Sequence, residues 1–150
     1  GAHSIFHMPA NTALRWEHFA HEADMGVRGC GATREAAFEQ AAVALIHVMC
    51  DPRDIAWTQT IAIDCHAPDN ELLLVDWLNA LIYEMATRHI LFGAFEVHID
   101  GFHLTAEARG EPIDVVRHQP AVEIKGATYT ELYVGQDASG VWCAQCVVDV

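Results

Sequence analysis

The feature that most constrains the fold of this chain is a long apolar run from Asn70 to Arg88. Pro68 and Asp69 come directly before it, and a helix often begins after such a pair. Its apolar side chains recur at helical spacing around much of the circumference rather than along one narrow stripe. Because a helix of this kind has to be covered on most of its sides, the sequence predicts that it forms the central helix of the fold.

A second helix and several strands are predicted around the central helix. Thr33 is a suitable N-cap for an amphipathic helix that ends at Met49, and Asp51-Pro52 follows it. Residues 57–66 alternate between apolar and polar side chains, as in a half-buried strand. Asp100-Gly101 predicts a hairpin between two further strands. The remaining expected elements are strands at residues 15–20, 25–30, 90–100, 102–109, 121–130, 131–134 and 141–148, and a short helical turn at 113–119.

Together these elements predict a single α+β domain over residues 15–150, preceded by a flexible leader at residues 1–14. The expected architecture is a mostly antiparallel β-sheet packed in two layers with two main α-helices. A chain of 150 residues is long enough to bury a substantial core. Its hydrophobic content of 52% argues against disorder.

Charge and cysteine content narrow the functional classes. The formal net charge is −13, which argues against direct nucleic-acid binding because phosphate contacts need a cationic surface. The same charge favours a bound cation, a basic protein partner or simple solubility. Five cysteines, an odd number without the spacing of a small disulfide-rich domain, favour reduced thiols and a cytoplasmic location. No apolar run is long enough to cross a membrane.

Two acidic positions suggest a cation site. Asp24 follows the first predicted strand, and Asp149 lies at the end of the last one, beside Val150. Two carboxylates about 4 Å apart repel each other by about 4 kcal/mol at an effective dielectric near 20, and a divalent cation offsets that cost. A divalent cation such as Ca²⁺, Mg²⁺ or Mn²⁺ would fit, because hard cations prefer oxygen ligands such as these carboxylates and the main-chain oxygens of Val150. The competing interpretation is that Asp24 makes a turn and Asp149 frays.

Residues near these two acids are candidates for supporting roles. His21 could orient a carboxylate or be a satisfied half-buried imidazole, and Glu22 could be an extra ligand or a solvated acid. Asp76 shares a helix face with Asn79, which favours either a contact with a strand end or with Lys125, or a polar contact that fixes the helix on the sheet.

Lys125 is predicted on a strand, with Glu123 on the same face. Its ammonium group could reach the acidic cluster or an acidic group of a partner, or form an ordinary surface pair worth about 0–1 kcal/mol. Cys143 and Cys146 resemble a redox or zinc pair, but residues three apart on a strand point to opposite faces, which makes a bond between them awkward.

The sequence contains no arrangement that predicts catalysis by this chain, and we assign no catalytic residue. It has no phosphate-binding glycine loop, no evident Ser-His-Asp order and no metalloprotease spacing among its histidines. The alternative is a metal-dependent hydrolase or nuclease that uses Asp24 and Asp149 with His21 or His118 as the base. The acidic composition disfavours the polyanionic substrate that such an enzyme would need.

Several segments taken together resemble the archease family over about Trp16 to Val150. Each is weak alone, but their order and spacing across nearly the whole chain make the resemblance specific. The segments are residues 21–27 (HEADMGV), 74–81 (LVDWLNAL), Gly110-Glu111, Asp114, His118, residues 123–129 (EIKGATY) and the terminal Val148-Asp149-Val150.

This resemblance implies a small accessory protein rather than an enzyme. Archeases assist an RtcB-type RNA ligase, which joins RNA ends bearing a 3′-phosphate or 2′,3′-cyclic phosphate, by promoting its guanylylation and multiple turnover in tRNA splicing and RNA repair. The family pattern implies a divalent cation, described as calcium, held by Asp24, Asp149 and Val150, and a functional Lys125. A general protein chaperone remains an alternative.

The chain departs from the family pattern at three positions. Glu22 stands where Thr is usual, Thr130 where His is frequent and Gly126 where Ala is frequent. Glu22 adds a negative charge beside the expected cation site, and Thr130 removes any role that would need an imidazole there.

Overall fold

The computed structural model describes residues 13–150, and it confirms a single α+β domain with antiparallel strands. Residues 1–12 of the predicted leader lie outside the described part, whereas Ala13 is buried against Cys30 and Val141. The helices are α2 (Arg34–Met49), α3 (Asn70–Arg88), α4 (Val115–His118) and the 3₁₀ helix η2 (Pro52–Asp54). The strands are β1 (Arg15–His21), β2 (Asp24–Gly31), β3 (Gln59–His66), β4 (Ile90–Asp100), β5 (His103–Pro112), β6 (Gly126–Ala127), β7 (Tyr133–Gln136) and β8 (Trp142–Asp149).

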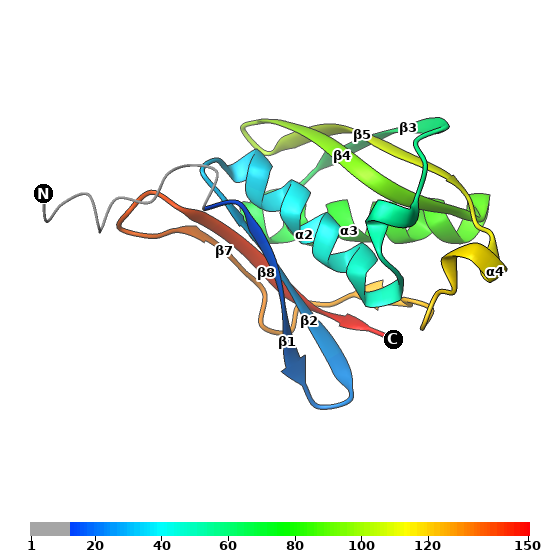
Figure 1. Ribbon diagram of the computed structural model, residues 1–150. Coiled ribbons are helices and arrows are strands. Elements are labelled where there is room, and N and C mark those ends of the chain that lie inside the picture. The colour runs from blue at the N-terminus through cyan, green and yellow to red at the C-terminus, as the bar shows by residue number, and fades with distance from the viewer. Residues whose placement is uncertain (1–12) are drawn as a thin grey trace, which may run out of the picture.

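The strands form two separate sheets rather than one. The larger sheet has the order β1-β2-β8-β6, with β7 also paired to β8, and the smaller has the order β3-β5-β4. Helices α2 and α3 lie between the two sheets, so the domain has a sheet, a helical layer and a second sheet (Figure 1). Burial on two sides explains why both helices carry apolar residues around so much of their surface.

The two main helices begin where their caps predict. The side chains of Thr33 and Asp69 accept hydrogen bonds from the backbone N–H groups of Ala36 and Leu72. Between the helices, the indole N–H of Trp77 donates to the carbonyl of Phe38 at 3.0 Å and satisfies the one polar atom of this fully buried side chain. The helix pair therefore forms a fixed platform for both sheets.

The predicted strand at residues 121–130 is the least accurate of the expected elements. Only Gly126 and Ala127 pair in a sheet, opposite Asp149 and Val148. Upstream, the N–H of Ala121 donates to the carbonyl of Met49 at the end of α2, so this segment follows the helical layer before it joins the sheet. Beta propensity alone does not reveal such a change of partner.

None of the helices within residues 13–150 has the length and apolar character needed to cross a lipid bilayer.

Candidate functional site

The candidate site lies at the end of the larger sheet where β2 begins and β8 finishes. Glu22 and Ala23 turn the chain between β1 and β2, and Glu22 adopts the left-handed backbone conformation at φ 55°. The β2–β8 ladder ends at the pair Met25–Val148. One position further along the same register, Asp24 and Asp149 stand opposite each other. Opposed residues of an antiparallel pair project from the same face of the sheet, so the two carboxylates share a face.

Val150 continues this strand end toward Asp24. Its backbone N–H donates to the Asp24 carboxylate Oδ1 over 3.5 Å, a long hydrogen bond. Asp24 and Val150 are half-buried, whereas Asp149 is exposed. The strands at the two extremes of the described chain therefore bring Asp24, Asp149 and Val150 into one neighbourhood, as the sequence predicted.

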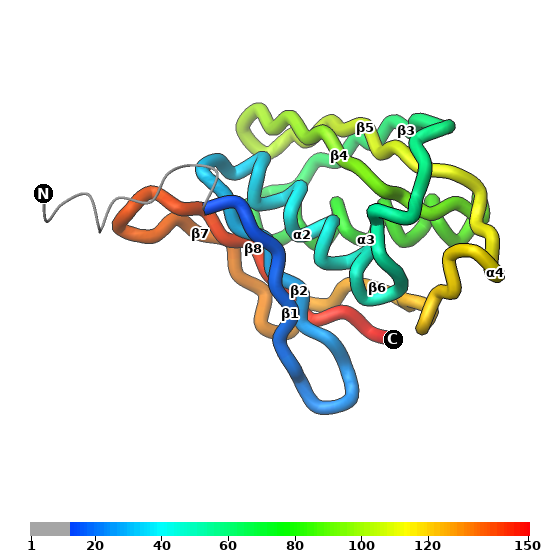
Figure 2. Tube along the Cα trace, viewed as in Figure 1, coloured from blue at the N-terminus to red at the C-terminus, as the bar shows by residue number. Residues whose placement is uncertain are grey.

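Lys125 borders the same strand end from the other side. Its backbone N–H donates to the carbonyl of Asp149 at 2.9 Å, and the next residue, Gly126, pairs with Asp149 in the ladder. Figure 2 shows the C-terminal end of the chain, at the end of β8, near the segment that leads into β6. Lys125 is exposed, and within residues 13–150 its ammonium group forms no ion pair, with Glu123 or any other acid. The predicted surface pair with Glu123 is absent because residues 121–125 are not a strand. The backbone of Lys125 is thus fixed beside Asp149, whereas its ammonium group has no ionic partner among residues 13–150.

The donor chemistry of this strand end fits a hard divalent cation. Asp24 and Asp149 supply carboxylate oxygens, and Val150 supplies main-chain oxygen, which are the ligand types that Ca²⁺ and Mg²⁺ take. His21 and Glu22 lie close to Asp24 in the sequence, where the chain turns from β1 to β2. His21 is half-buried and pairs with Asp24 in the β1–β2 ladder, and Glu22 is exposed in the turn.

Asp76 and Asn79, which were predicted to share a helix face, differ in their contacts. The Asn79 side chain accepts from the N–H of Ala127 at 2.9 Å and donates to its carbonyl at 3.4 Å, so it clamps α3 to β6. Asp76 is exposed and makes no hydrogen bond among the described residues. The contact that fixes the helix to a strand end belongs to Asn79, and Asp76 contacts neither the strand end nor Lys125.

A buried polar network that the sequence analysis did not predict joins β5, α4 and η2. Glu111 is 8% exposed, and its carboxylate accepts from Arg117 at 2.6 Å, from the N–H of Ala56 at 2.7 Å and from His118 Nε2 at 3.0 Å. The Arg117 guanidinium, followed by the Ala56 N–H and His118, lowers the pKa of Glu111 to about 2. Glu111 is therefore ionised at neutral pH.

His118 has no free ring nitrogen in this network. Its Nδ1 accepts from the backbone N–H of Asp114 at 2.8 Å, so the ring proton sits on Nε2 and is donated to Glu111. The imidazole is 5% exposed. His118 is thus a structural residue and is not available as the base of a hydrolase. Asp114 was the residue in the sequence that could have indicated this contact. As the N-cap of α4, it places His118 one turn later on the same side of the helix.

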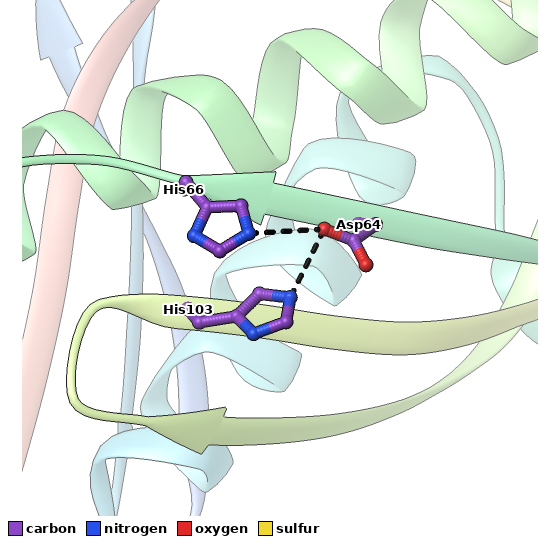
Figure 3. Close-up of side chains that lie close together, drawn as sticks. All are labelled: Asp64, His66 and His103. Atoms are coloured by element: carbon purple, nitrogen blue, oxygen red, sulfur yellow. Dashed lines mark hydrogen bonds and ion pairs between the residues drawn. The ribbon is translucent and has the colours of Figure 1, made fainter.

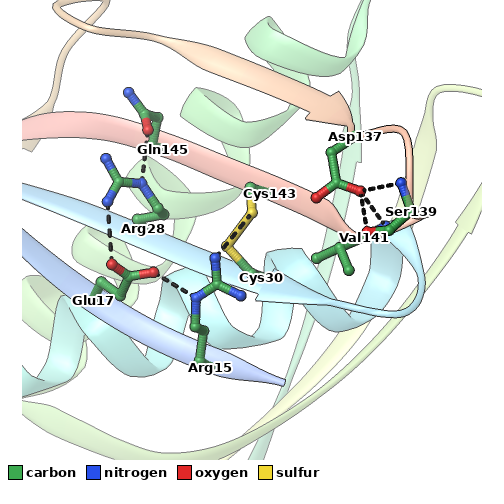
Figure 4. Close-up of a disulfide and its surroundings, with 9 residues drawn as sticks. All are labelled: Arg15, Glu17, Arg28, Cys30, Asp137, Ser139, Val141, Cys143 and Gln145. Atoms are coloured by element: carbon green, nitrogen blue, oxygen red, sulfur yellow. Dashed lines mark hydrogen bonds and ion pairs between the residues drawn. A yellow bond between two sulfur atoms is a disulfide. The ribbon is translucent and has the colours of Figure 1, made fainter. Parts of the chain in front are cut away.

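The prediction that all thiols are reduced is wrong. Cys30 of β2 and Cys143 of β8 are directly opposed in the ladder, and they form a disulfide with a Cα–Cα distance of 4.2 Å (Figure 4). A sequence separation of 113 residues hides this proximity until the strand register is known. Cys143 and Cys146 are not bonded to each other, as the strand geometry predicted.

The three other cysteines are free thiols. Burial raises the pKa of Cys65 to about 11 and that of Cys146 to about 12, and it also raises the pKa of Cys50. Because the thiolate is the reactive form, none of them is poised as a nucleophile at neutral pH.

The sequence and the fold were compared with known proteins. The sequence profile of the Archease protein family matches residues 16–150. Protein archease of Thermococcus gammatolerans is 37% identical over 140 residues, which is 91% of this chain and 99% of that protein. Protein archease of Pyrococcus furiosus is 39% identical with the same coverage.

Two solved structures have a similar fold. The solution structure of protein 1598 from Methanobacterium thermoautotrophicum superposes with a TM-score of 0.79 at 31% identity, covering 90% of this chain and 98% of that one. An archease from Thermotoga maritima, described as a possible chaperone, gives a TM-score of 0.61 at 20% identity and covers 89% of this chain and 96% of its own. The second likeness concerns the fold alone.

Proposed function

This chain belongs to the archease family, and on that premise we propose that it is a non-enzymatic activator of an RtcB-type RNA ligase. In this role it promotes guanylylation of the ligase and multiple turnover in tRNA splicing and RNA repair. Its partner is the ligase itself, and it makes no direct contact with RNA. Its strongly acidic composition supports this assignment, since a net charge of −13 repels a polyanion.

The observation that carries the proposal is the neighbourhood of Asp24, Asp149 and Val150 at the end of the β2–β8 pair. These residues would hold a divalent cation, Ca²⁺ by preference, through carboxylate and main-chain oxygens. When bound, the cation would neutralise the two carboxylates and lock the end of β8 against the start of β2. The residues themselves then form a rigid acidic end of the sheet, shaped by the β1–β2 turn.

This end of the sheet docks beside the metal centre of the ligase and positions the groups that react there. Lys125 supplies the one lysine ammonium of the chain at the same edge, where it pairs with an acidic group of the ligase. The carboxylates of Asp24 and Asp149, with Lys125 beside them, give the ligase an asymmetric pattern of charge to recognise. Such a pattern controls orientation and association rate more than it controls affinity.

The enzymatic alternative loses one of its two candidate bases. Both ring nitrogens of His118 are engaged in the Glu111 network, which leaves His21 as the only histidine proposed for that role. A reaction by this chain alone would also need the same acidic face to accept a phosphorylated substrate. The accessory role makes neither demand.

The test is a guanylylation assay of an RtcB-type ligase with GTP, with and without this protein, and with and without a chelator. The protein should accelerate guanylylation, and Asp149→Ala should abolish the stimulation while its thermal unfolding midpoint stays within about 2 °C of the parent. Asp100→Asn is the matched control, because it changes an exposed aspartate on the hairpin of the other sheet. It should stimulate as well as the parent.

Three outcomes separate the alternatives. Full stimulation by Asp149→Ala would remove the basis of the proposal. Cleavage or dephosphorylation of RNA by the purified protein with Ca²⁺, Mg²⁺ or Mn²⁺ and no partner would establish the hydrolase. Suppression of aggregation for unrelated clients, without any effect on guanylylation, would favour a general chaperone, the role suggested in the description of the Thermotoga maritima archease.

We also propose a cytoplasmic location, because the RNA ligase partner would act there. The Cys30–Cys143 disulfide is unusual for that compartment.

A further inference from the structure

Three side chains that the proposed function does not use converge on the smaller sheet. Asp64 and His66 come from β3, and His103 comes from the start of β5 (Figure 3). The His103 Nε2 lies 3.0 Å from the Asp64 Oδ1, and the His66 Nε2 lies 3.7 Å from the same oxygen. Their potential ligand atoms all lie within 4.8 Å of one another. The cluster thus brings two imidazole nitrogens and one carboxylate oxygen close together.

The sheet fixes this convergence. His66 and His103 are directly opposed in the β3–β5 ladder, and Asp64 lies two residues before His66 on the same face. The ladder is closed beyond this pair by the N–H of Ala67, which donates to the carbonyl of Phe102 at 3.2 Å. The two imidazole rings are stacked, with centroids 3.9 Å apart and planes inclined by 13°. Strand pairing therefore keeps the three side chains together on one face of the sheet, with the two rings parallel to each other in the absence of a ligand.

The spacing suits a small first-row metal ion. Ligand bonds of about 2.0–2.1 Å at tetrahedral angles place neighbouring ligand atoms about 3.3 Å apart. The two measured separations of 3.0 and 3.7 Å lie on either side of that value. Because a metal ion lies in the plane of each imidazole that binds it, the two rings would turn out of their stacked arrangement as the ion replaces the hydrogen bond between His103 and Asp64.

We propose that Asp64, His66 and His103 form a binding site for a transition-metal ion, Zn²⁺ above all, with a further coordination position open to solvent or to a partner. Two imidazoles and one carboxylate are a ligand set for Zn²⁺, Cu²⁺ or Ni²⁺, whereas Ca²⁺ and Mg²⁺ take oxygen ligands. The cluster lies on the outer face of the β3-β5-β4 sheet, away from Asp24 and Asp149 on the other sheet. The two sites would therefore select different classes of cation, and neither depends on the other.

The cluster is open to solvent, which sets what such a site can do. The side chains of His66, Asp64 and His103 are 72%, 63% and 40% exposed. An open three-residue site allows rapid metal exchange and leaves room for an additional ligand from outside. The ion would link β3 to β5 at the end of the sheet where the β4–β5 hairpin turns.

The test is a calorimetric titration of the whole chain with Zn²⁺ in the presence of saturating Ca²⁺, which occupies any oxygen site. The parent should bind one Zn²⁺ ion through this cluster. Asp64→Asn, His66→Ala and His103→Ala should each weaken this binding by about tenfold or more. His98→Ala is the matched control, since His98 is an exposed histidine on β4 of the same sheet and lies 3.5 Å from Glu96 rather than in the cluster.

A spectroscopic readout identifies the ligands directly. On addition of Zn²⁺, the Nε2 resonances of His66 and His103 should shift in long-range ¹H–¹⁵N spectra, while that of His98 should stay in place. The three exposed substitutions should leave the circular dichroism unchanged. The proposal is overturned if the parent binds no Zn²⁺ under these conditions, or if Zn²⁺ binds with the same affinity to His66→Ala and His103→Ala. A loss of binding in His98→Ala as large as in His103→Ala would also overturn it.

Discussion

Lys125 is the only lysine in the chain, and its ammonium group can therefore be changed selectively. We predict that Lys125→Ala stops stimulation of the ligase and shifts the unfolding midpoint by less than about 2 °C, since an exposed side chain without an ion pair adds little stability. Lys125→Arg should retain part of the activity, because a guanidinium keeps the charge but not the shape. The measurements are guanylylation rate and thermal unfolding.

Chemical modification offers an independent check of Lys125. Acetylation of the purified protein should reach this side chain and the α-amino group only, and should reduce stimulation as far as Lys125→Ala does. Acetylation of the Lys125→Ala variant should then have no further effect. A variant that stimulates normally without the ammonium group would exclude Lys125 from partner recognition.

Glu111 makes the free energy of unfolding depend on pH in the acid range. In the folded protein its pKa is lowered from 4.5 to about 2, first by Arg117, so unfolding raises its proton affinity. Its contribution to stability is complete above about pH 4.5 and is lost progressively as the pH falls toward 2. We predict that Glu111→Gln unfolds more easily than the parent at pH 7, and that the difference shrinks over this acid range.

Urea unfolding at a series of pH values measures the Glu111 effect. The exposed Glu123 provides the control, because Glu123→Gln should follow the parent curve closely across the range. An equal difference between Glu111→Gln and the parent at pH 7 and at pH 2 would contradict the proposed role of the carboxylate charge.

At the scale of single residues, the meeting of two strand ends was easier to predict than the hydrogen bonds around them. Asp24 and Asp149 could be placed together because both stand at strand ends, and such ends meet wherever the strands pair. A polar contact that fixes the helix to the sheet was predicted for the face of Asp76 and Asn79, but the partner of Asn79 and the hydrogen bonds of Glu111 were not, since each depends on a backbone group supplied by a segment far away in the sequence. Propensity and periodicity contain no information on such partners.

At the scale of elements, Gly29 determines how closely α2 approaches β2. A Cβ atom at Gly29 would lie 2.0 Å from the backbone nitrogen of Ala41 and 2.4 Å from the carbonyl oxygen of Ala37. Because these atoms belong to the helix backbone, the helix as a whole would have to move. We predict that Gly29→Ala destabilises the fold by about 3 kcal/mol, as measured by urea unfolding.

Gly126 is the matched control for Gly29. It also lies in a strand of the larger sheet, but the nearest atom to its Cβ position is the Asn79 Oδ1 at 3.6 Å, an ordinary contact. Gly126→Ala should change the free energy of unfolding by less than about 0.5 kcal/mol. Similar effects of the two substitutions would show that helix packing on β2 is looser than these distances imply.

The accuracy of the predicted elements follows from how local their signals are. Helix α3 was predicted with its observed bounds because the Asp69 cap and the apolar run both lie within the segment. Residues 121–125 were predicted as strand, yet none of them lies in a strand: Ala121 bonds to the end of α2, and only Lys125, at the end of the segment, bonds to β8. The division of the strands between two sheets was likewise not predicted, because two-sided burial of α2 depends on contacts between distant segments.

At the scale of the whole molecule, the sandwich keeps its two outer faces apart. The helical layer separates the larger sheet, which ends at Asp24 and Asp149, from the smaller sheet, which carries Asp64, His66 and His103. An ion bound to one sheet therefore cannot touch residues of the other directly. We expect the Zn²⁺ affinity of Asp149→Ala to match that of the parent, and the stimulation by His103→Ala to match that of the parent as well.

The Cys30–Cys143 disulfide acts on the whole molecule because it closes a loop with a sequence separation of 113 residues. A cross-link across a loop of that length reduces the entropy of the unfolded chain, which stabilises the fold by about 4 kcal/mol. We predict that a thiol reductant lowers the unfolding midpoint of the parent by on the order of 10 °C. Differential scanning calorimetry with and without dithiothreitol measures the shift.

The double variant Cys30→Ala/Cys143→Ala isolates the contribution of the bond. It should unfold near the midpoint of the reduced parent, and dithiothreitol should leave that midpoint unchanged, because the three remaining thiols form no disulfide in the folded protein. Stimulation of the ligase by the double variant should persist at temperatures below its midpoint, since neither cysteine belongs to the strand end that carries Asp24 and Asp149. A midpoint in the parent that does not respond to reductant would show that the stability of the fold does not depend on the bond.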